Sequence, residues 1–477
     1  MKKYILGLMI FSMNFFFFFS QPDTNDYTRQ WQLIDSLIAE KNLPKTALKK
    51  VNELYALAVK TDNETQAIKA LLYKISLSAQ TDETDINNTI ALIKKEIGNT
   101  SSPAHQSLLY LLVAHTYQNY ADEHSWNIYN RSSTKKFAKN DIATWGADDF
   151  TTAVNEAFDK ALANGAVLKK TLLKPFEAVI LKGNSENLRP TLYDLVAHDA
   201  LDHYKNANNY ITGPAYAFEI NKEVALGVVE RFTNYGFASA DTASNLLKAL
   251  QLFQQLIRFH RSDAEPSAFI DVNLERIQWV YETGVMQNKE LLYTRALDEV
   301  TTKYADHPVA AQAWYIKAQA HASKAKMYKP FADTANRYHF VLAKQLIEER
   351  LKAQPAVSPG NTNMQMLLQE ITAKSLHAEV EDVNVPGLPF RLSLHYKNTD
   401  TLYTRIIKKA GNNSEENEMQ NWEEGFWKKI ANLKYIRSAV QPLPATNDYQ
   451  QHSTEIKVDA LPPGNYYILG SIGKNFI

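Results

Sequence analysis

The sequence lacks cysteine, an excess of either charge, and frequent glycine. None of its 477 residues is a cysteine, which excludes disulfides, thiol nucleophiles, thiolate metal sites and a lipid attached to a cysteine near the N-terminus. The 52 Lys and Arg residues balance the 52 Asp and Glu residues, so no basic field is available to neutralise phosphates. We therefore expect no nucleic-acid partner. Only 16 glycines are present, so helix interiors are rarely interrupted.

Sequence motifs of common enzymes are also missing. The chain has no glycine-rich phosphate loop, dinucleotide fingerprint, nucleophile elbow, serine–lysine pair of acyl transferases or HExxH zinc helix. Local chemistry therefore predicts that the protein is not an enzyme. We expect no catalytic, cofactor-binding or metal-binding residues, no cofactor and no small-molecule substrate.

Length and composition are those of a folded protein. A chain of 477 residues predicts two or three domains. Apolar residues make up 45% and charged residues 22%, which argues against wholesale disorder and against a membrane protein with many spans.

The first residues have the layout of a secretory signal peptide. Two lysines precede an apolar stretch over 4–19, and the character of the sequence changes at Ser20. This stretch is shorter than the roughly 20 residues that a membrane-spanning helix needs. We expect residues 1–20 to be a cleaved signal peptide, no further transmembrane span, and export to the periplasm or cell envelope. An uncleaved anchor stays open, because Phe18 is a poor substitute for the small residue a cleavage site prefers.

Residues 23–375 are predicted to form a helical domain. Apolar residues recur there with a period near 3.6, which places one apolar stripe on each helix and requires a neighbouring helix to bury it. The clearest stripes are Leu33, Ile34, Leu37 and Ile38; Ala47, Leu48, Val51, Leu54, Tyr55 and Ala58; Phe150, Val154, Ala157, Phe158 and Ala161; Leu246, Leu250, Phe253 and Ile257; and Ile270, Leu274, Ile277 and Tyr281.

The segment 291–320 has the pattern of two paired helices. One helix carries Ala296 and Leu297, a turn closes at Pro308, and the second helix offers small residues around Trp314. Small faces let helices approach closely, as in a tetratricopeptide-like hairpin. Because no strict repeat of about 34 residues is present, we predict an irregular tetratricopeptide-like helical solenoid. An ordinary irregular all-α domain is the alternative.

Residues 376–477 change to the period-two pattern of β-strands. Two strands on either side of an Asn-Thr-Asp turn, 390–396 and 402–408, predict a hairpin. Further strands are predicted over 454–458 and 466–471, with weaker candidates over 380–385 and 434–440. We expect an immunoglobulin-like β-sandwich that is truncated, because such a sandwich has about seven strands and the chain ends before the sheet closes.

The segment 412–443 is rich in acidic and aromatic residues. It is either a protein-binding loop or a solvated insertion or short helix whose aromatic side chains pack on the sandwich. We favour the second interpretation, since charge runs are usually solvated faces.

One set of residues has spacing that permits a cation site. Asp194, His198 and Asp202 fall at i, i+4 and i+8 on one helix face, with His203 one position away from it. A hydrogen-bonded carboxylate–histidine pair is the more common arrangement, and we favour it. We interpret His105, His115 and His124 as ordinary histidines without a carboxylate partner at ligand spacing. Aromatic residues at Trp126, Tyr129, Trp145 and Phe150 form either a ligand groove or, more commonly, core.

The order of segments resembles the N-terminal part of bacterial alpha-2-macroglobulin family proteins of the Bacteroidetes type. The resemblance lies in a signal peptide, a long helical region and a β-sandwich, and in five phrases of the sequence: 43–48 (LPKTAL), 188–198 (LRPTLYDLVAH), 388–398 (LPFRLSLHYKN), 448–456 (DYQQHSTEI) and 460–466 (ALPPGNY). It implies that residues 376–477 are the first of several macroglobulin-type domains. In that family these domains are followed by a bait segment and, in many members, by a Cys-Gly-Glu-Gln thioester that captures an attacking protease.

The chain departs from the complete family pattern. It has no cysteine, so it cannot form the thioester, and no catalytic residue is carried over. The resemblance implies an exported module of a protease-trapping endopeptidase inhibitor, with proteases or envelope components as partners. An envelope helical-repeat adaptor that binds a partner protein is the alternative. An enzyme with a helical core has no basis in the residues.

Overall fold

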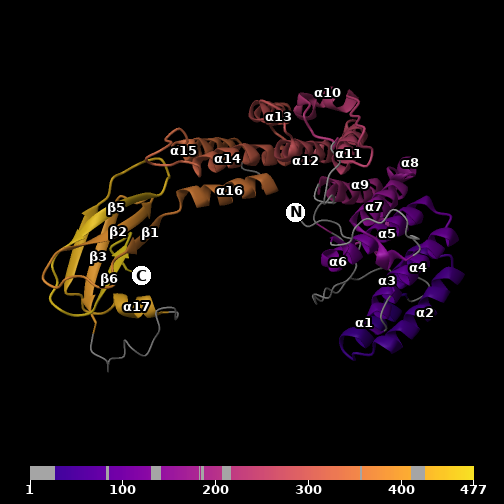
Figure 1. Cartoon of the computed structure of the whole chain (residues 1–477), viewed down its shortest axis with the longest axis horizontal. Helices are drawn as coiled ribbons and strands as arrows, with labels where there is room; N and C mark the ends of the chain where they lie inside the picture. Colours follow the sequence, from indigo (N-terminus) through magenta and orange to yellow (C-terminus); the bar gives the residue numbers. More distant parts are fainter. Residues whose placement is uncertain are drawn as a thin grey trace. The chain divides into compact units, whose positions relative to one another are not determined.

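The computed structural model describes residues 27–81, 85–129, 141–181, 183, 187–206, 216–354, 357–409 and 425–476. The predicted signal peptide, 1–20, lies outside them. This part of the chain is mainly helical, with small antiparallel sheets near its C-terminal end (Figure 1). It divides into two compact units, Met1–Ala296 and Leu297–Ile477. No helix within the described ranges is both long and apolar enough to cross a membrane.

The first unit is built from short helices that pack on their neighbours in sequence. Its helices are α1 (Tyr27–Ala39), α2 (Pro44–Lys60), α3 (Glu64–Thr81), α4 (Ile86–Asn99), α5 (Pro103–Glu123), α6 (Ser125–Tyr129), α7 (Ala147–Leu162), α8 (Gly165–Leu168), α9 (Leu192–Lys205), α10 (Val229–Asn234), α11 (Asn245–His260) and α12 (Ser267–Thr283). Short 3₁₀ turns lie at Ile142–Thr144, Lys174–Phe176 and Glu223–Leu226, and α13 (Lys289–Lys303) spans the division between the units.

Most residues of the predicted apolar stripes form the core of this unit, but Leu33 of the first stripe is exposed. Trp31, Ile34 and Leu37 of α1 pack with Val51 and other small or apolar residues of α2 and α3. The stripe of α7 from Phe150 to Ala161 is buried, and so are the central residues of the stripes on α11 and α12. Helical periodicity predicted these faces because it is a property of the local sequence.

The second unit begins with a group of three helices. They are α14 (Ala311–Ala325), which follows a 3₁₀ turn at Pro308–Ala310, α15 (His339–Ala353) and α16 (Pro359–Thr372). The predicted close pairing of the two helices within 291–320 is wrong, because the small residues of α14 pack against α15 and α16, which come later in the chain, instead of against α13. Lys317 of α14 makes an ion pair with Asp298 of α13, with 2.6 Å between Lys317 Nζ and the carboxylate.

Gly360 sets the distance between α16 and α14. A Cβ added at Gly360 would lie 2.3 Å from the Ala311 carbonyl carbon and 2.4 Å from the Gln312 nitrogen, and these are backbone atoms that cannot move aside. Gly360→Ala is therefore expected to lower the free energy of unfolding by about 2–3 kcal/mol in urea denaturation. Gly98→Ala is the control, because Gly98 is helical and has open space around its Cα. It should raise stability by about 0.5–1 kcal/mol; equal effects at both glycines would contradict the proposed clash.

Six strands follow, in two antiparallel sheets. They are β1 (Ser375–Glu379), β2 (Phe390–Lys397), β3 (Thr401–Lys408), β4 (Arg437–Pro442), β5 (His452–Val458) and β6 (Tyr466–Ser471). The strand orders are β1-β2-β5 and β4-β3-β6. Side chains from both sheets meet in one apolar core that includes Leu394, Leu402, Ile406 and Val458. The strands predicted over 454–458 and 466–471 are confirmed.

The predicted hairpin of the strands at 390–396 and 402–408 is wrong. β2 pairs with β1 and β5, while β3 pairs with β4 and β6, so these consecutive strands lie in different sheets. Asn398, in the left-handed region at φ 56°, lies between them. Its Nδ2 donates to the carbonyl oxygens of Ile371 at 2.8 Å and Ala373 at 2.9 Å, at the end of α16. These bonds hold the turn against a helix, and the chain crosses from one sheet to the other.

The weaker strand candidates are corrected as well. The strand predicted at 380–385 lies earlier, at β1, whose pairing with β2 runs from Ser375 opposite Lys397 to Glu379 opposite Ser393. The candidate at 434–440 corresponds to β4, which begins at Arg437. Within 412–443, the described part contains a short helix, α17 (Phe426–Ala431). Phe426 packs with Ile407 and Leu469 as expected, whereas Trp427 is about half exposed.

Candidate functional site

Two of the three predicted cation residues, Asp194 and His198, lie in a buried set of charged side chains around α9, which we call the α9 cluster. Its members come from α9, α11, α12 and the segment before α9: Arg189, Asp194, His198, Lys205, His260, Asp271 and Glu275. Asp194 is fully buried, and His198 is 4% exposed. Such burial is costly for charged groups unless they are paired.

Asp194 has two structural partners. Thr191 caps α9, because its Oγ1 accepts from the Asp194 amide while the Asp194 carboxylate accepts from the Thr191 amide at 3.0 Å. The other carboxylate oxygen contacts His260 Nε2 of α11 at 2.7 Å. Burial acts to lower the pKa of His260, but the hydrogen bonds and charges of Asp194 and Asp263 outweigh it and raise that pKa. His260 thus joins α11 to the N-terminus of α9.

His198 and Asp202 have other partners. His198 Nδ1 lies 3.3 Å from Glu275 Oε2 on α12, although neither atom makes a hydrogen bond of good geometry within the described residues. Lys205 binds Glu275 and lies 2.9 Å from Asp202. Burial acts to raise the pKa of Glu275, but His198 and Lys205 outweigh it, so that pKa lies well below its usual range.

Asp271 of α12 completes the α9 cluster. Its carboxylate lies 3.9 Å from the Arg189 guanidinium. Burial raises the pKa of Asp271, and the nearby positive charge of Arg189 only partly opposes this effect. The α9 cluster therefore contains groups whose pKa is raised and groups whose pKa is lowered. Both active sites and structural ion-pair networks have this property.

The structure does not bring Asp194, His198 and Asp202 together around a common point. Each pairs with a residue from another part of the chain or, for Asp202, with Lys205 one turn further along α9. Among the residues described, no group of three or more His, Asp or Glu side chains is arranged to hold a metal ion. The α9 cluster is best explained as the set of bonds that joins α9, α11 and α12.

Two of the three histidines that have no carboxylate at ligand spacing in the sequence contact a carboxylate from another helix. His105 Nδ1 lies 2.7 Å from Glu64, and His115 Nε2 lies 2.6 Å from Asp199. His124 does stack on a tyrosine and contacts a backbone carbonyl of its own helix. The carboxylate partners of His105 and His115 are on other helices, where no spacing pattern in the sequence indicates them.

The Glu64–His105 pair lies beside a pocket of about 400 Å³ between α2 and α5. Two glutamates line this pocket, Glu64 and Glu96. Thr100 donates its hydroxyl to Glu64, and Tyr55 donates its hydroxyl to Glu96. Because these carboxylates already have hydrogen-bond partners, the pocket does not by itself indicate a ligand.

The aromatic residues considered for a ligand groove are mainly core. Phe150 is buried, and its ring contacts those of Tyr117, Tyr120 and Trp145. Trp126 is largely exposed, and the side chain of Tyr129 lies outside the described residues.

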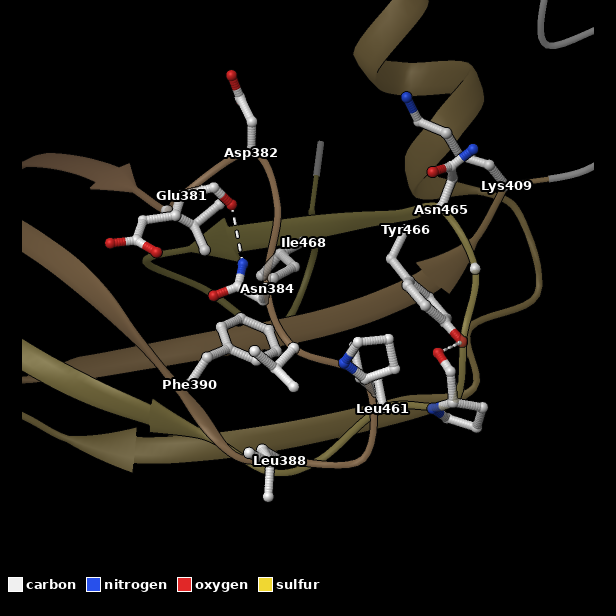
Figure 2. Close-up of a pocket in the computed structure, with 15 residues that line it drawn as sticks. Glu381, Asp382, Asn384, Leu388, Phe390, Lys409, Leu461, Asn465, Tyr466 and Ile468 are labelled. Carbon is white, nitrogen blue, oxygen red and sulfur yellow. Dashed lines mark hydrogen bonds between the residues drawn. The ribbon is translucent and has the colours of Figure 1, made fainter.

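A further pocket, of about 340 Å³, opens at one end of the two sheets (Figure 2). The loop after β1 supplies Glu381, Asp382 and Asn384, and β6 supplies Tyr466 and Ile468. Phe390 and Leu461 add apolar surface, and Figure 2 shows Lys409 on the side opposite Glu381. Sequence reasoning missed this pocket, because its lining comes from three separate segments, 380–390, Lys409 and 461–468.

Comparison with known proteins does not identify a function for either pocket or for the α9 cluster. No protein-family model and no curated protein matches the chain. The function is therefore inferred from the residues and contacts of the chain itself.

Proposed function

We propose that this chain is the helical N-terminal region and first macroglobulin-type module of an exported, alpha-2-macroglobulin-like protease-trapping protein. In this proposal the helices form an irregular tetratricopeptide-like solenoid, and the sheets form an immunoglobulin-like sandwich. The observation that carries it is the order of parts: helices, then two three-stranded antiparallel sheets that share one core. The apolar stretch over 4–19 supports export to the periplasm or cell envelope.

The phrases that carry the resemblance have structural roles that fit this proposal. The phrase 388–398 contains β2, the central strand of its sheet, and 460–466 contains the turn that leads into β6. The phrase 448–456 contains Asp448 and Gln450. The Asp448 carboxylate accepts from Arg337 Nε at 2.7 Å, and the Gln450 side chain donates to the Ala325 carbonyl oxygen at 3.1 Å. These two bonds therefore join the segment before β5 to the end of α14 and to the segment between α14 and α15.

The isolated chain should neither cleave proteins nor protect them from proteases. A protease trap of the family that the chain resembles needs a bait segment and, in many members, a thioester, and a chain without cysteine cannot form the thioester. We expect the rates at which a protease hydrolyses a large protein substrate and a small peptide substrate to stay unchanged as the chain is added. Dose-dependent protection of the large substrate alone would contradict this expectation, since it would indicate that this chain is sufficient to trap a protease.

A free-standing envelope adaptor is the second candidate. The exposed apolar residues around the pocket of Figure 2 favour it, because such surfaces mark contacts with other proteins. The genomic DNA after the codon for Ile477 distinguishes the two. A continuing reading frame with more sandwiches and a thioester supports the protease trap, and a stop codon followed by an unrelated gene supports the adaptor.

A further inference from the structure

The pocket of Figure 2 lies along an open edge of the β4-β3-β6 sheet. Among the described strands, β6 is the outer strand of this sheet and pairs only with β3. Lys409 donates its amide to the Asn465 carbonyl oxygen at 2.8 Å, and the pairing continues with Lys408 opposite Tyr466. Along a strand in an antiparallel sheet, the backbone N–H and C=O groups of one residue bond to the partner strand, and those of the next residue point to the opposite side. The backbone groups of Tyr466 and Ile468 therefore point outward, toward the open edge.

The open edge is a groove between β6 and the loop after β1. At the far end of β6 the two sheets come close, since a Cβ on Gly470 would be 3.4 Å from Leu376 of β1. Nearer the start of β6 the chain leaves β1 and turns, with Asn384 Nδ2 donating to the Glu381 carbonyl oxygen at 2.8 Å. The pocket fills the space that this separation creates (Figure 2).

Apolar side chains line this groove at the surface. Phe390, Tyr466 and Ile468 belong to the margin of the sandwich core and are reached from the pocket. On the facing loop, Val385 and Leu388 are 65% and 57% exposed. An exposed apolar surface next to unpaired strand backbone is the arrangement used in β-strand addition, where main-chain bonds give affinity and alternate side chains enter pockets.

The charge on the loop side of the groove is negative. Glu381 and Asp382 are both exposed, and neither makes an ion pair with any described residue. In Figure 2 the Asp382 carboxylate points away from the strands into the open. A strand with basic side chains would therefore be attracted here, and an acidic strand would be repelled.

We propose that this groove binds an extended strand of a partner protein, which pairs with the free edge of β6, inserts an apolar side chain into the pocket and places basic side chains beside Glu381 and Asp382. This site does not depend on the family proposed above. Its failure would leave the protease-trap proposal standing. A reading frame that continues past Ile477 would add a strand of the same chain as a competitor for the edge of β6, so the peptide experiment below tests the groove in the 477-residue chain.

The experiment measures binding of labelled peptides to the full chain by fluorescence anisotropy. The probe is a peptide of about eight residues with alternating valine and lysine, which spans roughly 27 Å when extended. Two comparison peptides are used. In the first, glutamate replaces each lysine, and the second keeps the lysines but carries N-methyl groups on alternate amides. We expect saturable binding of the valine–lysine peptide, binding weaker by roughly tenfold for the glutamate version, and loss of binding on N-methylation.

Variants of the chain test the two sides of the groove separately. The double change Glu381→Lys and Asp382→Lys should invert the preference, so that the glutamate peptide binds more tightly. The control with the same change in net charge is Glu348→Lys with Glu349→Lys on α15, which should leave the preference as it is. Leu388→Ser, at an exposed position, should weaken binding of the lysine peptide several-fold without changing the fold.

Amide hydrogen exchange supplies a readout for the pairing itself. The amides of Tyr466 and Ile468 should become protected when the lysine peptide binds, because they gain strand partners. The proposal is overturned by equal binding of the lysine and glutamate peptides, by full binding of the N-methylated peptide, by unchanged exchange at β6, or by no binding at millimolar peptide.

Discussion

Replacing Asp194 with alanine is expected to lower the free energy of unfolding of the first compact unit by about 3–5 kcal/mol. The carboxylate is fully buried and contacts His260 Nε2 at 2.7 Å, and His260 is itself 2% exposed. The same carboxylate accepts from the amide and hydroxyl of Thr191, which caps α9. Its removal leaves the buried His260 with one partner fewer and leaves the Thr191 amide and hydroxyl without this acceptor. Each loss is costly in the interior.

The pH dependence gives this prediction a distinct signature. Because the pKa of His260 is raised in the folded state, its contribution to stability is fully present below the unfolded pKa of about 6.5 and is lost as pH rises through the folded pKa. The difference between the wild-type chain and Asp194→Ala should therefore be largest near pH 6 and shrink toward alkaline pH. Urea denaturation at several pH values measures it.

Asp263 provides the matched control, because it contacts the other nitrogen of the same histidine. Its carboxylate lies 2.7 Å from His260 Nδ1 but is 35% exposed. Asp263→Ala should cost no more than about 1 kcal/mol, since solvent screens the pair. Equal losses for the two variants would show that burial of Asp194 is not the reason for its effect.

Replacing Asp448 with alanine should destabilise the second unit by about 3 kcal/mol. Asp448 is fully buried between the helices and the sheet. One carboxylate oxygen accepts from Arg337 Nε at 2.7 Å, and the other contacts His452 Nε2 at 2.8 Å and accepts from the Gln450 amide at 3.1 Å. Asp448→Ala removes the acceptor for Arg337, which lies between α14 and α15, and for His452 at the start of β5. The contact that these two residues share through the carboxylate is therefore lost.

This loss should depend on pH in the opposite direction. Burial acts to raise the pKa of Asp448, but the hydrogen bonds from His452, Arg337 and Gln450 outweigh it and lower that pKa. A lowered carboxyl pKa contributes stability above the unfolded value of about 3.9, and this is lost as pH falls through the folded pKa. The difference between the wild-type chain and Asp448→Ala should therefore be full at pH 7 and decrease below about pH 4.

The control for Asp448 is an exposed carboxylate of the same unit. Asp459 is paired with Lys457 at 3.4 Å, and both side chains are 70% exposed. Asp459→Ala should change stability by less than about 0.5 kcal/mol. A loss at Asp459 as large as that at Asp448 would contradict the explanation by burial.

Much of the secondary structure was predictable because it depends on local patterns. The period of 3.6 located α7, α11 and α12, and alternation located β2, β5 and β6. Pairing was not predictable from the same signal. Alternation in β2 and β3 fits a hairpin as well as two strands in different sheets. In the structure they lie in different sheets, and Asn398 between them binds the end of α16.

The candidate site shows the same limit. Spacing placed Asp194 and His198 on one helix, and they are buried there, but their partners come from α11 and α12. His105 and His115 have no carboxylate at ligand spacing in the sequence, and each contacts one from a distant segment. The groove beside β6 gave no signal in the sequence, since no single segment contains enough of its lining to form a motif.

The sequence by itself determined that this protein has no thiol chemistry, carries no net charge, and places its helices before its strands. These are properties of composition and of neighbouring residues, which do not depend on how the chain folds back on itself. Only the tertiary structure decided which strands pair and which carboxylate meets which histidine. Asp194 and His260 are 66 positions apart, and contacts over such distances arise from the packing of whole elements.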